Sequence, residues 1–180
     1  RNLDLWAEYA DGKVTKEELN RQRYLYPLEA VGAGDSTLAK AYERDALTMI
    51  PTKSKLMPHA REVLEYLSGK YNLYILSNGF KELQSHKMRS SGIDEYFKKV
   101  VLSDDIGILK PWPEIFHFAL STTQSELNNS LMIGDSWEND IVGAAGVGMH
   151  QVFYNLSGRT DLPFAPTYQI TDLKDLFNFL

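Results

Sequence analysis

The sequence contains no cysteine among its 180 residues. This absence excludes disulfide bonds, thiolate chemistry and cysteine-ligated metal sites, and it agrees with a cytoplasmic protein. The sequence also lacks an excess of positive charge, because 19 Lys and Arg residues stand against 24 Asp and Glu residues, for a net charge of -5. A protein that binds the backbone of a nucleic acid needs a positive footprint. We therefore expect no polymeric nucleic acid among its partners.

Long apolar runs are also missing. No segment approaches the roughly 18 apolar residues of a membrane-spanning helix, and no basic-then-apolar signal segment opens the chain. We therefore expect no membrane partner, and a cytoplasmic monomer or homodimer. Apolar residues make up 43% of the sequence, which is enough for one hydrophobic core with a small second unit beside it.

Residues 1–52 predict helices and no strand. Thr15 and Glu18 have the spacing of a capping box, in which two side chains bond the free amides at a helix start. The helix that follows should run to about Val31, where a Gly-rich turn interrupts the apolar pattern. A second helical pattern then ends before Pro51. These residues form a small helical unit.

From residue 53 onward, short apolar runs alternate with amphipathic segments. The predicted strands cover residues 72–79, 98–105, 130–136 and 150–154, and the predicted helices between them begin near residues 81, 113 and 139. Alternation of this kind requires right-handed crossovers and a parallel sheet. The fold class is therefore α/β, a Rossmann-like parallel sheet with helices on both faces, and residues 155–168 are expected to be a surface loop.

The strand ends carry the residues of chemical interest, because ligands bind beyond the carboxyl ends of an open parallel sheet. One predicted strand ends with Ser77, Asn78 and Gly79. A hydroxyl, an amide and an open backbone N–H at a helix start can all face an anion. The same three residues are also favourable in turns, so this segment alone leaves both interpretations open.

A second strand end carries acidic residues. Asp135 follows the strand that ends at Gly134, and Asp140 lies in the first turn of the next predicted helix. Magnesium takes one or two carboxylates together with water and substrate phosphate. The alternative is that Asp135 only ends the strand while Asp140 stabilises the helix N-terminus. Lys110, which precedes a proline, is either a solvated surface residue or a cation that neutralises a bound phosphate.

In this order, the segments LYILSNG, LKP and GDSWENDIVGAAGVGM resemble the second, third and fourth motifs of the haloacid-dehalogenase-like (HAD-like) superfamily. The resemblance covers Leu56 to Gln151, and residues 1–52 resemble the helical cap of the branch that inserts one after the first strand. It implies an enzyme with a phosphate-binding set formed by Ser77, Asn78, Gly79 and Lys110. Ser77 and Lys110 are the expected catalytic residues within it. Asp135 is implied to ligate Mg²⁺, and Asp140 to support the metal.

One motif of the family is missing. Its members place an Asp-x-Asp pair after the first core strand, where the first Asp attacks phosphorus and the second acts as general acid and base. Asp4 and Asp11 lie in a helical context and follow no strand. We expect a truncation before Arg1, so that residues 1–52 are an incomplete cap and residues 53–180 a core without its central first strand. The sheet should then be split, and this chain alone should be inactive.

The resemblance implies magnesium-dependent hydrolysis of a small phosphate monoester through an aspartyl-phosphate. A pyrimidine 5'-nucleotide or a sugar phosphate is the expected substrate. A 2-haloacid dehalogenase is one alternative, although family dehalogenases generally carry small neutral residues where this chain has Gly134 and Asp135. A non-catalytic binding module on the same scaffold is another.

Overall fold

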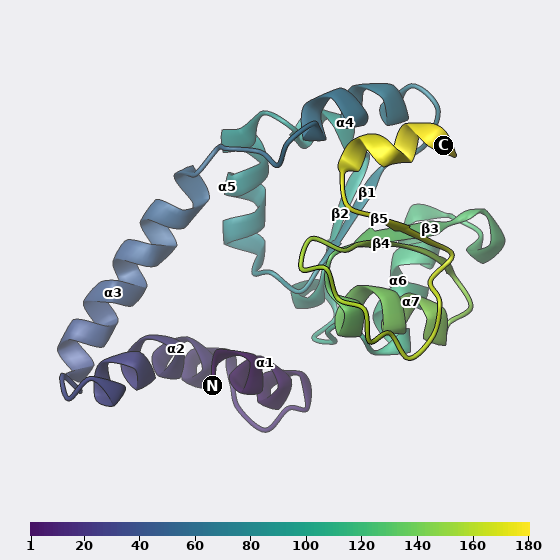
Figure 1. The fold of residues 1–180 in the computed structure, drawn as a ribbon. Helices are drawn as coiled ribbons and strands as arrows, with labels where there is room; N and C mark the ends of the chain where they lie inside the picture. Colours follow the sequence, from purple (N-terminus) through teal and green to yellow (C-terminus); the bar gives the residue numbers. More distant parts are fainter. The chain divides into compact units, whose positions relative to one another are not determined.

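The computed structural model describes residues 1–2, 4–81 and 83–180 of the chain (Figure 1). Two compact units make up the fold, Arg1–Ser54 and Lys55–Leu180. From the sequence we expect this boundary after residue 52. None of the helices in the described ranges is long and apolar enough to cross a lipid bilayer.

The first unit is helical throughout, as expected. It contains α1 (Asn2–Ala10), α2 (Lys16–Ala30) and α3 (Ser36–Met49), followed by a short 3-10 turn at Ile50–Thr52. Thr15 caps α2, since its Oγ1 accepts a hydrogen bond of 3.1 Å from the Glu18 amide. Asp35 caps α3 in the same way, through a 2.7 Å bond from the Thr37 amide. These caps satisfy amides that have no partner inside the helix, which explains where both helices begin.

The second unit alternates helices and strands. In chain order it contains α4 (Ala60–Ser68), β1 (Tyr74–Ser77), α5 (Lys81–Ser91), β2 (Lys99–Leu102), α6 (Pro113–Thr123), β3 (Leu131–Gly134), α7 (Gly143–Gly146), β4 (His150–Tyr154) and β5 (Tyr168–Ile170). A π-helical turn at Trp137–Val142 leads directly into α7. The α/β class predicted from the sequence is therefore confirmed.

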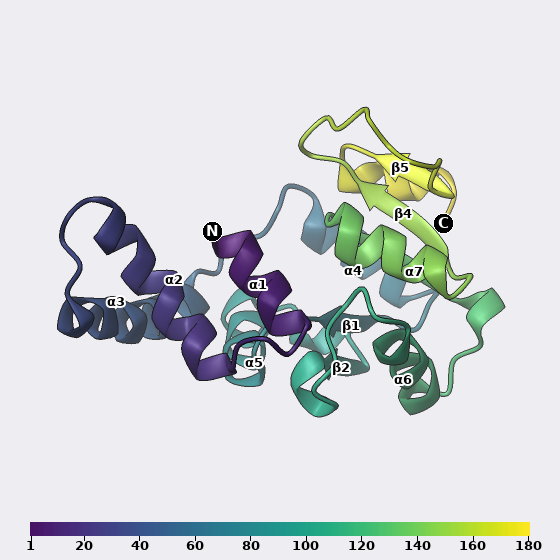
Figure 2. The same ribbon diagram turned by 90° about the horizontal axis from the view of Figure 1, so that it is seen from below.

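The strands form two separate parallel sheets, one of β1 and β2 and one in the order β3-β4-β5. This matches the split expected from the sequence. The last register pair of β1 and β2 joins Ser77 to Leu102, and that of β3 and β4 joins Gly134 to Phe153. In Figure 2 the strands β1 and β2 lie between α5 and α6.

The sheet of β3, β4 and β5 is covered on both faces. Ile133 packs with a cluster that includes Val63 and Leu67 of α4, whereas its neighbour Met132 packs with a cluster that includes Phe116 of α6 and Ala144 of α7. Successive side chains of a strand point to opposite faces. The helices therefore cover both sides of this sheet, which is the arrangement that a buried parallel sheet requires.

Two elements differ from the sequence-based expectation. β5 was not predicted, and it begins at Tyr168, where the expected surface loop ends. It is held by pairing with β4 and by stacking of the Tyr168 ring on Phe179 at 4.1 Å. The helix expected from residue 139 instead starts at Trp137 as a π-helical turn. The strand β5 depends on contacts with residues that are distant along the chain, and the π-helical turn depends on its backbone hydrogen bonding. Local periodicity of apolar residues encodes neither.

Candidate active site

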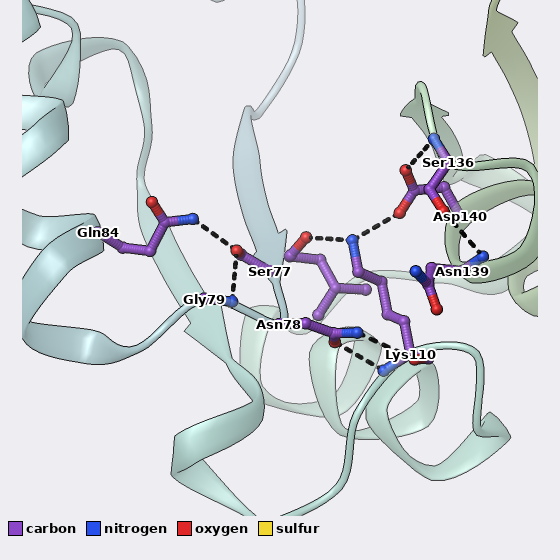
Figure 3. A network of polar contacts seen from close by, with 9 residues as sticks. Ser77, Asn78, Gly79, Gln84, Lys110, Ser136, Asn139 and Asp140 are labelled. Carbon is purple, nitrogen blue, oxygen red and sulfur yellow. Dashed lines mark hydrogen bonds and ion pairs between the residues drawn. The ribbon is translucent and has the colours of Figure 1, made fainter. Parts of the chain in front are cut away.

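The predicted site residues gather where β1 and β3 end. Ser77 is the last residue of β1 and Gly134 the last of β3. Figure 3 shows that Lys110, Ser77 and Asp140 belong to one neighbourhood of polar contacts. This arrangement agrees with the general position of ligand sites in open parallel sheets.

Lys110 is buried at the centre of this network, with a relative exposure of 8%. Its Nζ donates to Asp140 Oδ1 at 2.6 Å and to the Leu76 carbonyl oxygen of β1 at 2.8 Å. An ammonium group has three N–H donors and no acceptor. Two of them are used by these acceptors, so one remains for a bound anion. The lysine is therefore not the solvated surface residue of the alternative interpretation.

Asn78 fixes the backbone of Lys110. Its side-chain Oδ1 accepts a 2.7 Å hydrogen bond from the Lys110 amide, and its Nδ2 donates to the Lys110 carbonyl oxygen at 3.0 Å. Because the Asn78 amide pairs with both backbone groups of Lys110, it fixes the position and the orientation of the Lys110 backbone. From the sequence we expect Asn78 to face a bound anion, but its side-chain amide is instead paired with Lys110. Nothing in the spacing of the two residues indicates this pairing.

Ser77 is bonded on the side of β1 away from Lys110 (Figure 3). Its Oγ accepts hydrogen bonds from the Gly79 amide at 3.0 Å and from Gln84 Nε2 at 2.5 Å. The Gly79 amide, which the sequence analysis expected to assist phosphate binding, thus donates to Ser77. Gln84 was not singled out from the sequence, because a glutamine in an amphipathic helix carries no distinctive pattern.

Asp140 anchors Lys110 from the π-helical turn. Its exposure is only 4%, and both carboxylate oxygens are engaged, since Oδ2 also accepts from the Ser136 amide at 3.0 Å. A buried carboxylate needs such partners, because an unpaired charge in the interior is costly. Through these contacts Asp140 holds the ammonium group of Lys110 at the strand ends.

Asp135 differs from Asp140 in its surroundings. It is exposed, and no hydrogen bond or ion pair links its carboxylate to another residue in the described part of the chain. A free carboxylate next to a strand end fits a hard cation such as Mg²⁺. Within the described ranges no group of three or more His, Cys, Asp or Glu side chains is arranged to hold a metal ion. The free carboxylate of Asp135 is therefore compatible with one ligand position of a magnesium site.

Glu138 lies between these two acids in sequence but has another partner. Arg159 Nη1 donates to its Oε1 at 2.7 Å, and this bond lowers the pKa of the Glu138 carboxyl group. A lowered pKa keeps a carboxylate ionised at neutral pH. Glu138 is thus a surface ion-pair residue and a poor general acid.

Comparison with known proteins identifies related sequences and structures. Pyrimidine 5'-nucleotidase YjjG of Escherichia coli is 29% identical over 181 residues, which cover 99% of this chain and 79% of that protein. The magnesium-bound crystal structure of the HAD-hydrolase YfnB from Bacillus subtilis has a TM-score of 0.89 at 28% identity, and the match covers 99% of this chain and 78% of the other. A 2-haloacid dehalogenase from Pseudomonas syringae pv. Tomato has a TM-score of 0.70 at 26% identity, covering 98% and 76%.

A sequence model of a protein family also matches the chain. The model described as haloacid dehalogenase-like hydrolase matches residues 4–148, which is most of the chain. The match includes the candidate site residues Ser77, Lys110, Asp135 and Asp140. The chain therefore belongs to the haloacid dehalogenase-like hydrolases.

Proposed function

We propose that this hydrolase cleaves small phosphate monoesters in a magnesium-dependent reaction. The observation that carries the proposal is the buried ammonium group of Lys110, which is held by Asp140 and Leu76 at the strand ends and keeps one N–H donor for an anion. A phosphoryl group in transfer spreads negative charge over its oxygens, and fixed positive groups stabilise that charge. The geometry fits a phosphate better than a neutral substrate.

Each site residue has a role in this reaction. The Ser77 hydroxyl donates to a phosphoryl oxygen, and Lys110 neutralises the charge of the phosphate and of the attacking carboxylate. Asn78 and Asp140 hold Lys110 in position from its backbone and from its ammonium group, respectively. Asp135 would hold Mg²⁺, which supplies further charge neutralisation when bound.

The nucleophile in this proposal is the first carboxylate of an Asp-x-Asp pair, a pattern that the sequence of residues 1–180 does not contain. Attack of that carboxylate on phosphorus expels the alcohol, and water then hydrolyses the aspartyl-phosphate. The second Asp protonates the leaving alcohol and later takes a proton from the water.

For the substrate we propose a pyrimidine 5'-nucleotide or a sugar phosphate. The Escherichia coli relative, named a pyrimidine 5'-nucleotidase, supports the first of these. The structural similarity to a 2-haloacid dehalogenase supports a second reaction class, in which a carboxylate displaces halide without a metal. The free carboxylate of Asp135 favours the phosphatase, because metal-independent displacement of halide gives it no role.

The first test is metal dependence. With the complete gene product, we expect hydrolysis of an aryl phosphate in Mg²⁺ and loss of that activity after chelation. We expect Asp135→Asn to weaken the apparent magnesium affinity by about 10- to 100-fold, because one charged ligand becomes neutral. The assay measures initial rates as a function of Mg²⁺ concentration. Turnover that persists without metal would overturn the phosphatase assignment and favour the dehalogenase.

The matched control for this test is Asp94→Asn. Asp94 is exposed and precedes β2, so it lies at the amino end of that strand and away from the carboxyl ends that form the site. The Asp94→Asn substitution removes one negative charge from the second unit, as Asp135→Asn does. An equal loss of magnesium affinity in this variant would show that the effect at Asp135 reflects net charge and no specific site.

A second test concerns residues 1–180 alone. We expect this chain to be inactive toward aryl phosphates, because it supplies Ser77, Lys110 and Asp135 but no Asp-x-Asp pair. Rates of aryl phosphate hydrolysis with and without Mg²⁺ check the expectation. Measurable turnover by residues 1–180 would mean that the nucleophile is among them.

A further inference from the structure

We propose that Gln84 is a positioning residue that turns the Ser77 hydroxyl into a dedicated donor for the phosphoryl group. The inference rests on the proposed phosphatase function. Gln84 lies in the first turns of α5, and its side chain reaches back to the end of β1 (Figure 3). It does not itself contact the substrate in this scheme and acts only through Ser77.

The hydroxyl group of Ser77 can take part in a limited number of hydrogen bonds. A serine hydroxyl has one O–H donor and two acceptor lone pairs. Ser77 Oγ accepts from the Gly79 amide at 3.0 Å and from Gln84 Nε2 at 2.5 Å. Both lone pairs are therefore occupied by N–H donors. The single proton must then be directed at a third atom, and it cannot be lost to either of these neighbours.

A hydroxyl fixed in this way is suited to an anion. The hydroxyl of an unconstrained serine can rotate or donate to a nearby carbonyl oxygen. In either case its O–H is not directed at the phosphate when the phosphate binds. Two fixed N–H donors remove these alternatives before binding, so the ordering cost is not incurred when the substrate binds. Hydrogen bonds in which the acceptor is ionised are also stronger than neutral ones.

Gly79 provides the space for this contact. A Cβ atom at position 79 would lie 2.9 Å from Gln84 Cγ and 3.0 Å from Gln84 Nε2. A Cβ contact under 3.0 Å forces a shift, and here the Gln84 side chain would have to move away from its present position. The glycine thus serves two purposes, since its amide bonds Ser77 and its missing side chain leaves room for the Gln84 amide. Ser77, Gly79 and Gln84 form one unit around a single oxygen atom.

The test measures binding of inorganic phosphate to the complete gene product in Mg²⁺ by titration calorimetry. We expect Ser77→Ala to weaken phosphate binding by about tenfold, since a hydrogen bond to a charged group is lost. Gln84→Met keeps the length of the side chain but removes the donor, and we expect a loss of about threefold to tenfold. In the Ser77→Ala background, Gln84→Met should cause no further loss, because its effect passes through Ser77.

Gln84→Glu separates positioning from packing. Glutamate has the shape of glutamine but can only accept, so it would draw the Ser77 proton to itself, and we expect binding weaker than that of Gln84→Met. Gln169→Glu, on the exposed face of β5, makes the same charge change as a control and should leave binding unchanged. A purely structural role would predict equal losses for Gln84→Met with and without Ser77, in parallel with a lowered melting temperature.

The outcomes distinguish this inference from the proposed function. Independent losses in the double variant, tolerance of Gln84→Glu, or no phosphate binding by the unaltered protein would each overturn the role of Gln84. Turnover of an aryl phosphate is measured on the same samples. Absence of turnover together with phosphate binding that depends jointly on Ser77 and Gln84 would contradict the phosphatase reaction while supporting the positioning role.

Discussion

Replacement of Lys110 by methionine is expected to lower kcat for an aryl phosphate by about a thousandfold, the upper range for loss of one fixed group that stabilises transition-state charge. The ammonium group is buried between Asp140 Oδ1 and the Leu76 carbonyl oxygen, and methionine supplies no charge in its place. Methionine keeps the apolar stem of the side chain. Steady-state kinetics of the complete gene product check the effect, and Lys98→Met, at an exposed position before β2, is the control.

The same substitution should also lower the free energy of unfolding. It leaves the Asp140 carboxylate, which is 4% exposed, without its cation. Removal of one partner of a buried ion pair costs about 3 to 5 kcal/mol. Urea denaturation of residues 1–180 measures this loss without any need for activity.

A double variant separates the two effects. Addition of Asp140→Asn to Lys110→Met removes the orphaned charge while an amide oxygen still accepts from the Ser136 amide. We expect most of the lost stability to return while turnover stays low. Recovery of turnover together with stability would mean that Lys110 contributes only to folding, and the charge-neutralising role would be wrong.

The sequence was sufficient to predict the strand ends but not the contacts between them. Ser77, Lys110, Asp135 and Asp140 stand at positions fixed by the order of strands and helices, and strand order can be read from local apolar patterns. The two sheets are separate, and Lys110 links their strand ends, because its Nζ bonds both the Leu76 carbonyl oxygen of β1 and Asp140, which follows β3. The neighbourhood of the site therefore follows from periodicity together with the rule that ligands bind at carboxyl ends.

The finer contacts depend on side-chain geometry. Asn78 pairs with both backbone groups of Lys110, and Gln84 bonds Ser77, although neither pair has a spacing that marks it in the sequence. The π-helical turn that carries Asp140 is likewise invisible to an apolar pattern, because it changes the backbone bonding and leaves the burial of Trp137 and Ile141 as in a helix. β5 is too short to show a strand periodicity of its own.

Gly134→Ala is expected to be the most destabilising single-methyl substitution in the site. A Cβ atom at this position would lie 2.5 Å from the Cβ atom of Asp140 and would also overlap its carboxylate. The clash involves the base of the Asp140 side chain, so a rotamer change alone cannot relieve it. The π-helical turn must move as a whole, and the buried pair with Lys110 is then stretched or broken.

We expect this substitution to lower the free energy of unfolding by about 3 to 5 kcal/mol, the range for loss of a buried ion pair, whereas overpacking alone would cost about 1 to 3 kcal/mol. Typical domains have only about 5 to 15 kcal/mol in total, so the variant should unfold at a much lower urea concentration. Gly146→Ala is the matched control, because a Cβ atom there meets nothing within 4 Å and alanine favours a helix.

Phosphate binding gives the second readout for Gly134→Ala. If the fold survives at low temperature, the displaced Asp140 no longer holds Lys110, and affinity for inorganic phosphate should fall in the same variant. Gly146→Ala should retain both stability and affinity. Unchanged stability and affinity in Gly134→Ala would mean that the end of β3 has room for a methyl group, and the close approach of Asp140 to the strand would not be what holds Lys110 in place.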